Sequence, residues 1–226
     1  MKLFRSIRTN YFPALSDRLL FLCGLLMLCS EIWKQYMLTF VLGGGSYNWW
    51  YFPFQLCSIP MYILIAYPWL RSPGIRRTLL TFLMSYTLLG GIAVFADTSG
   101  LHYAYAPLTA HSYLWHCLLI LIGISCGFIY FRFFGNQNTL RAFAGSTGLY
   151  LICCAAAEGF NLSFDRFGEI NMFYINPDYQ MQQIVFHDLS LVIGNPPAIL
   201  LYIAATVFGA FLLLLVWRLV FRFLPR

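Results

Sequence analysis

The residue with the clearest capacity for chemistry stands inside an otherwise apolar stretch. Cys57 lies between Pro53 and Pro60, beside Gln55 and Ser58. Two prolines seven residues apart interrupt the hydrogen bonding of a helix and free backbone groups that a buried site can use. A thiol in this setting is either a reactive nucleophile or a small apolar packing residue. The residues alone leave both interpretations open.

Two histidines, His111 and His116, open a later apolar stretch. A histidine inside a membrane is costly, and a general base is one natural use of it. A hydrogen bond to a neighbouring helix is the equally good alternative. Being five residues apart, the two rings do not share a helix face, and no other Cys or His spacing resembles a zinc site. We therefore expect no metal and no cofactor.

Further polar groups accompany these residues. Glu31 and Lys34 stand in the first apolar stretch, three residues apart and therefore on one helix face. They form either a structural ion pair or the polar wall of a cavity. Asn171 belongs to a later polar cluster that is either the rim of the same site or ordinary solvated surface.

The composition of the chain is that of a membrane protein. Hydrophobic residues make up 60% of the 226 positions and charged residues only 10%, whereas about a quarter of the residues of a soluble domain are charged. The formal net charge of +6 is spread over short connections and both ends of the chain, and no basic stretch alternates with aromatic residues. We therefore expect membrane lipids as partners and no nucleic acid.

Six apolar stretches are long enough to cross a bilayer core, which needs about 20 residues. The expected spans are Leu19–Leu42, Tyr51–Leu70, Thr78–Phe95, Ser112–Phe131, Ala142–Phe160 and Pro197–Val220. The pattern predicts an all-α fold, a polytopic bundle of about six transmembrane helices. This single domain covers residues 19–222 and follows a basic tail at residues 1–18. No small-residue cleavage site follows the tail, so a cleaved signal peptide is not expected.

Basic residues fall on one side of this six-span arrangement. They lie in the tail, in the second and fourth connections and at the C-terminus: Lys2, Arg5, Arg8, Arg18, Arg71, Arg76, Arg77, Arg132, Arg141, Arg218, Arg222 and Arg226. The other three connections hold one basic residue, Arg166, against five acidic ones: Asp97, Asp165, Glu169, Asp178 and Asp188. Cytoplasmic loops carry the excess of Lys and Arg, so we expect both termini in the cytoplasm.

The longest connection, Asn161–Pro196, lies outside in this orientation. It is rich in Asp, Asn, Gln, Tyr and Phe, which makes it too aromatic for a solvated linker. Long connections within a compact domain are typically lids or binding loops. We expect an external segment that is lid-like or re-entrant.

The order of these pieces resembles that of the bacterial YwaF-type integral membrane proteins, whose relatives include a human acyltransferase that acts on ether phospholipids. The segments that carry the resemblance are Glu31–Lys34, Phe52–Ser58, Tyr113–His116, Gly168–Phe173 and Gly194–Pro197. They occur in the expected order between about Leu19 and Val220. One position departs from the family, since Gln55 stands where its members have a histidine.

The resemblance implies that Cys57 and His116 carry acyl transfer. A thiolate attacks an ester carbonyl of a lipid, and an alcohol or water takes the acyl group from the resulting thioester. We therefore expect a lipid acyltransferase or lipid-ester hydrolase in the plasma membrane of a bacterium. The residues expected to line its cavity are Glu31, Lys34, Gln55, Ser58, His111 and Asn171. A transporter or lipid-binding protein, or a non-catalytic membrane scaffold, remains the alternative.

Overall fold

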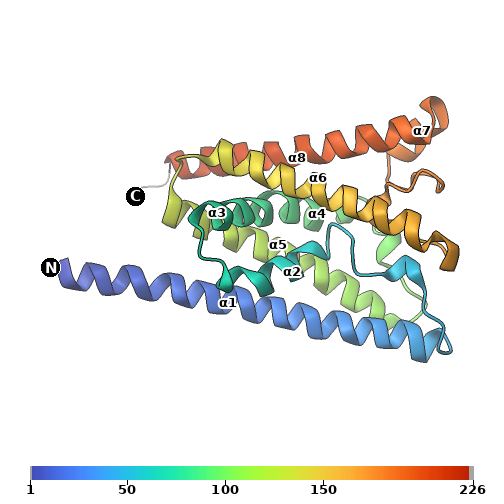
Figure 1. The fold of residues 1–226 in the computed structure, drawn as a ribbon, viewed down its shortest axis with the longest axis horizontal. Coiled ribbons are helices and arrows are strands. Elements are labelled where there is room, and N and C mark those ends of the chain that lie inside the picture. Colours follow the sequence, from blue (N-terminus) through green and yellow to red (C-terminus); the bar gives the residue numbers. More distant parts are fainter. Residues whose placement is uncertain (1, 224–226) are drawn as a thin grey trace.

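The computed structural model is a bundle of helices that share one long axis (Figure 1). It describes residues 2–223, with side chains from residue 15 onward. Two parts of the chain lie outside the described residues: Met1 and residues 224–226, which include Arg226, predicted to be cytoplasmic. The side chains of Lys2, Arg5 and Arg8 lie outside them as well. Within the described part every regular element is a helix and no strand occurs.

Across residues 2–223, eight α-helices build the bundle: α1 Lys2–Tyr36, α2 Ile59–Ala66, α3 Pro73–Phe82, α4 Leu88–Ala93, α5 Ala106–Phe134, α6 Thr139–Phe164, α7 Phe186–Ile193 and α8 Asn195–Phe223. A π-helical turn, Met37–Leu42, extends α1, and a second one, Leu83–Thr87, joins α3 to α4. Short 3₁₀ turns occupy the connections, at Trp49–Tyr51, Tyr67–Trp69, Val94–Ala96, Ser99–Leu101, Asp165–Phe167 and Met172–Tyr174.

Four helical segments among the described residues are long and apolar enough to cross a membrane: Pro73–Ala96, Ala106–Phe134, Thr139–Phe167 and Asn195–Phe223. Each contains one of the last four predicted spans. The chain therefore has the helices of a multi-pass membrane protein. The first two predicted spans do not fall in one of these four segments. The first lies in the second half of α1 and the π-helical turn after it, and the second contains only the short apolar helix Ile59–Trp69.

The predicted basic tail is not a separate element. Residues 2–18 form the first half of α1, which continues without interruption to Tyr36. In Figure 1 the first turns of this half project beyond the other helices, and the Lys2 end of α1 lies at the same end of the bundle as the Phe223 end of α8. At this end Arg76 of α3 pairs with Asp17 of α1 at 2.6 Å and lies over the Tyr67 ring, 4.2 Å from its centroid.

The predicted second span is helical only in its second half. Residues 52–58 have no regular helix, and α2 begins at Ile59 with Pro60 in its first turn, where the missing N–H of proline has no intrahelical partner to lose. Irregular backbone at membrane depth is tolerated only where protein encloses it. The interruption expected from the two prolines is thus present, and neighbouring helices must satisfy its free backbone groups.

The rod formed by α3, the π turn and α4 lies at the centre of the bundle, and all residues from Leu80 to Leu88 are buried. The carbonyl of Met84, in the π turn, accepts a hydrogen bond from Nε1–H of Trp217 in α8, at 3.0 Å. The Trp217 ring also packs so closely on Gly127 of α5 that a Cβ there would overlap it. One tryptophan therefore ties three transmembrane helices together.

Candidate functional site

A cavity of about 620 Å³ lies between the helices, toward the end of the bundle that carries α7. Its walls come from the end of α1, the irregular segment before α2, α4, the first turns of α5, the external segment and α8. Six of the eight predicted site residues border it: Lys34, Gln55, Cys57, Ser58, His111 and His116. The other two, Glu31 and Asn171, stand behind the wall and are almost completely buried.

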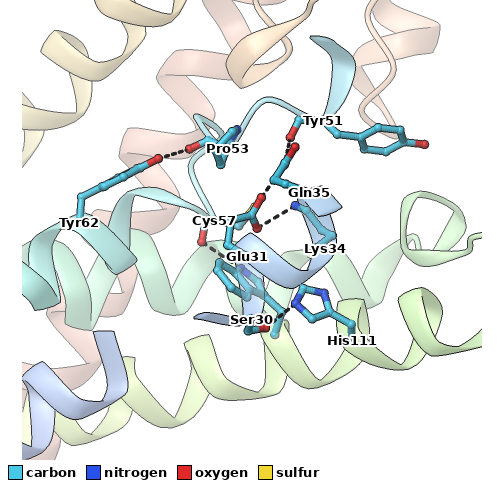
Figure 2. A network of polar contacts seen from close by, with 10 residues as sticks. Ser30, Glu31, Lys34, Gln35, Tyr51, Pro53, Cys57, Tyr62 and His111 are labelled. Atoms are coloured by element: carbon cyan, nitrogen blue, oxygen red, sulfur yellow. Dashed lines mark hydrogen bonds and ion pairs between the residues drawn. The ribbon is translucent and has the colours of Figure 1, made fainter. Parts of the chain in front are cut away.

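Cys57 reaches the cavity from the irregular segment that precedes α2. Its thiol is free and half-buried. Nε1–H of Trp115 in α5 donates to the carbonyl oxygen of Cys57 at 3.1 Å, and the hydroxyl of Tyr62 donates to the carbonyl of Pro53 at 2.7 Å (Figure 2). Two backbone acceptors freed by the interrupted helix are thereby satisfied, and the position of Cys57 is fixed against α5.

His116 borders the same cavity from α5. Its Nδ1 lies 2.8 Å from the carbonyl oxygen of Ser112. A carbonyl can only accept, so Nδ1 carries the proton and Nε2 is left with its lone pair. This is the tautomer that a general base requires. In the part of the chain that the structure describes, no hydrogen bond joins the Cys57 thiol to His116.

Glu31 and Lys34 form the ion pair that their spacing predicts, with Nζ and Oε2 2.8 Å apart (Figure 2). Gln35 adds a second contact, because its Nε2 donates to Oε1 of Glu31 and to the carbonyl of Tyr51, both at 2.7 Å. Glu31 is 3% exposed, and only Lys34 of the pair borders the cavity. The carboxylate therefore positions an ammonium group that is available at the cavity wall.

Gln55 fastens the external segment across the cavity. Its Oε1 accepts a hydrogen bond from the backbone N–H of Phe173 at 2.6 Å, and its Nε2 donates to the carbonyl of Asn171 at 2.9 Å. The side chain of Asn171 is turned to its own segment, where Oδ1 accepts from the N–H of Asn176 at 3.0 Å. The structure thus gives Gln55 and Asn171 a positioning role, and one Nε2 hydrogen of Gln55 stays available to the cavity.

Residues 161–196, the longest predicted connection, fold over one side of the cavity, and we call them the cap. Asn161 accepts from the N–H of Met172 at 2.7 Å, and Asn195 donates to the carbonyls of Pro177 and Tyr179 at 2.8 and 2.7 Å. These amides bond to the backbone of residues 168–185, in which the turn Met172–Tyr174 is the one helical piece, and buried backbone groups need such partners. The cap borders the cavity through residues 173–174 and 182–186.

Three residues of the cap that border the cavity adopt left-handed backbone angles. The φ values are 57° at Phe173, 58° at Tyr174 and 72° at Val185. Such angles are rare outside glycine and rarest for a β-branched residue. Local strain of this kind persists only where the surrounding contacts impose it, and it gathers at ligand-binding sites.

His111 differs from His116 in its surroundings. Its Nε2 lies 2.5 Å from the hydroxyl of Ser30 in α1 (Figure 2), and its buried Nδ1 has no partner. The ring lies between Trp33 and Trp115, with centroid distances of 5.6 Å to each. The two histidines are thus held by different partners and do not converge. Across residues 15–223, no three His, Cys, Asp or Glu side chains gather as they would to hold a metal ion.

Several aromatic residues of the wall have no counterpart among the predicted site residues: Tyr51, Tyr103, Trp115, Tyr174 and Tyr202. The chain has 15 tyrosines and 22 phenylalanines, and no spacing distinguishes those at the cavity. Burial raises the pKa of Tyr103 to about 12. Its phenol therefore stays protonated at neutral pH, and it can donate a hydrogen bond to a bound ligand.

Comparison with known proteins adds no relative to this description. The chain matches no protein-family model, no curated protein and no solved structure.

Proposed function

We propose that this chain is a membrane-embedded enzyme that transfers or hydrolyses the acyl group of a lipid ester, with Cys57 as nucleophile and His116 as general base. The observation that carries the proposal is the shared cavity. A free thiol and an imidazole with an available Nε2 border one space of about 620 Å³ inside an apolar bundle. Nucleophile and base in one pocket are the minimum that covalent acyl transfer requires.

The reaction would proceed in two balanced halves. His116 Nε2 takes the proton of the Cys57 thiol, directly or through one water, and Sγ bonds to the ester carbonyl carbon. The C–O bond breaks, and the lyso-lipid leaves with that proton. In the second half an alcohol or water gives its proton to His116 and attacks the thioester, the C–S bond breaks, and the thiol recovers the proton.

The remaining wall residues fit the binding of a phospholipid. The ion pair with Glu31 uses one of the three Nζ hydrogens of Lys34, so the ammonium can still bind a phosphate oxygen. Ser58 and the remaining amide hydrogen of Gln55 are donors at the wall beside Cys57, where an oxyanion would form. The cap covers part of the cavity, and exclusion of water from the thioester would favour transfer to a lipid alcohol over hydrolysis.

The proposal includes six spans, both termini in the cytoplasm of a bacterium, and membership of the YwaF-type family. The interrupted segment Tyr51–Trp69 and the second half of α1 complete the count of spans. Support comes from the described basic residues Arg18, Arg71, Arg76 and Arg77, which belong to the end of the bundle where α1 begins and α8 ends. Acidic residues prevail in the cap at the opposite end.

The rival function is that of a lipid-binding or transport protein. Cys57 and His116 share the cavity without a hydrogen bond between them among the described residues. Catalytic hydrogen bonds are often long before substrate binds, so this geometry is compatible with both functions. The non-catalytic scaffold would need neither thiol nor imidazole. Of the three alternatives, only the enzyme forms a covalent intermediate.

The test is peptide mass spectrometry on protein purified with native lipid. We expect a fatty-acyl mass on the Cys57 peptide that neutral hydroxylamine removes. It should be absent in Cys57→Ala and form much more slowly in His116→Ala, because the imidazole takes the proton of the thiol before Sγ attacks.

Cys117 provides the matched control. It adjoins His116 in sequence but is exposed on the outer surface of α5, so Cys117→Ala should leave the Cys57 adduct unchanged. An adduct on Cys117 alone would be ordinary S-acylation, unrelated to the cavity. If Cys57 carries no adduct in wild type or in His116→Ala, while cellular lipid profiles are the same for all variants, the enzyme proposal fails and the binding or scaffold function is favoured.

A further inference from the structure

A second hollow, of about 430 Å³, lies in the seam between α1 and α5. Its lining comes from Leu26, Met27, Ser30 and Trp33 of α1 and from residues 107–118 of α5. Ser30 and His111 are its only hydrogen-bonding side chains apart from the indoles of Trp33 and Trp115. The hollow follows α5 for roughly 16 Å at 1.5 Å per residue. We call it the α1–α5 groove.

The groove is open toward the outside of the bundle. Leu26 is 61% exposed and Leu114 is 69% exposed, whereas Met27 at the base of the groove is fully buried. Both helices are apolar on this side, and α5 is one of the helices long enough to cross the membrane. In a bilayer, hydrocarbon chains of lipids therefore border the groove.

The groove and the cavity that holds Cys57 share two wall residues, His111 and Trp115. The partition between them is therefore one layer of side chains. Trp115 is also the residue that holds the carbonyl of Cys57. The contact between Ser30 and His111 crosses from α1 to α5 at the same place.

We propose that the α1–α5 groove binds a hydrocarbon chain of the lipid whose ester reaches Cys57, and that this lipid enters sideways from the bilayer between α1 and α5. The inference rests on the proposed function, since it assigns the chain site of the same substrate. An apolar groove with a few polar groups at one end suits an amphiphile whose tail lies in the groove and whose polar part points inward.

The contact between Ser30 and His111 closes this entrance, and we call the pair the latch. A lipid that passes between the helices must separate the hydroxyl from the imidazole, which are 2.5 Å apart. The buried Nδ1 of His111 has no partner in the closed arrangement. An ester or phosphate oxygen of the entering lipid can accept a hydrogen bond from the imidazole once the latch opens.

The experiment uses the full chain with Cys57→Ala, so that binding is measured without chemistry. The protein is reconstituted with a phosphatidylglycerol that carries a diazirine on one acyl chain, irradiated, and digested for mass spectrometry. We expect adducts on the peptides of Leu26–Trp33 and Pro107–Leu118 to exceed those on α8 several-fold, although α8 is less buried inside the bundle than α5. The variants Ala110→Trp and Leu26→Trp, which fill the groove from opposite walls, should remove this excess.

Leu200→Trp is the matched control, because Leu200 of α8 is 68% exposed and lies outside the groove. It should leave groove labelling unchanged, and unchanged labelling of α8 in Ala110→Trp would show that this variant is folded.

Equal labelling of groove and α8 in the parent, or an excess that survives both groove variants, overturns the inference. A Cys57 thioester in the active chain without groove labelling would leave the proposed function standing and only the chain site refuted. Groove labelling without any thioester would indicate lipid binding without acyl transfer.

Discussion

A charge buried in the bundle is tolerable only when a partner neutralises it. Glu31 is 3% exposed, and its two carboxylate oxygens contact Lys34 and Gln35 at 2.8 and 2.7 Å. The cost of taking both charges out of water offsets most of their attraction, so the pair adds little net stability as a unit. Removing one partner is different, because the other charge then stays buried and unpaired.

Lys34→Met should therefore destabilise the protein by about 3 kcal/mol, measured as the free energy of unfolding in a fixed detergent. The double variant Glu31→Gln/Lys34→Met should regain most of that loss, because the neutral amide needs no cation. Arg18→Met removes a positive charge from an exposed position of the same helix and should change stability little. Equal effects of Lys34→Met and Arg18→Met would show that the buried pair does not act as described.

The external segment is an element held by side-chain amides instead of by regular secondary structure. Gln55, Asn161, Asn171 and Asn195 each hydrogen-bond its backbone. Gln55 is the only one of these four that reaches the segment from the interrupted second span. It links the cap directly to the stretch that carries Cys57, so the position of the cap and that of the thiol are coupled.

Gln55→Leu should release this side of the cap. The loss of two hydrogen bonds costs about 2 kcal/mol, and amide hydrogen exchange at Phe173 should accelerate, since that N–H loses its acceptor. Gln182→Leu is the control, because Gln182 also borders the cavity but is exposed. Slow exchange at Phe173 in Gln55→Leu would mean that other contacts hold the cap.

The whole molecule has two chemically different ends. One carries the start of α1, the end of α8 and the contact of Arg76 with Asp17. The other carries the cap, α7 and the mouth of the cavity, where Asp97 is exposed and accepts a hydrogen bond from the N–H of Ser99 at 2.9 Å. If the basic end is cytoplasmic, the cavity opens toward the outer leaflet, and substrates must come from there.

Orientation can be measured with single cysteines and a membrane-impermeant maleimide, in a background where all seven native cysteines are replaced by alanine. Asp178→Cys, in the cap, should be labelled in intact cells. Asn136→Cys, in the connection between α5 and α6, should be labelled only after the membrane is permeabilised, which also serves as the control for its reactivity. The reverse pattern would place the cap and the cavity mouth in the cytoplasm.

The sequence by itself determined the class of the protein, because the length and polarity of an apolar stretch are sums over neighbouring residues. Four of the six predicted spans fall within helices long and apolar enough to cross a membrane. The interruption between Pro53 and Pro60 was also predictable, since proline breaks a helix through its own backbone. The pairing of Glu31 with Lys34 followed from helical periodicity, a local property as well.

Only the tertiary structure decided how the polar residues are used. Gln55 meets Phe173 across 118 positions of the chain, and Trp115 meets Cys57 across 58. His111 and His116, which do not share a helix face, nevertheless border one cavity, because the end of α1, the interrupted segment and the cap surround the first turns of α5. Such contacts depend on which surfaces pack together, a property of the assembled bundle that no local sum of hydropathy or spacing contains.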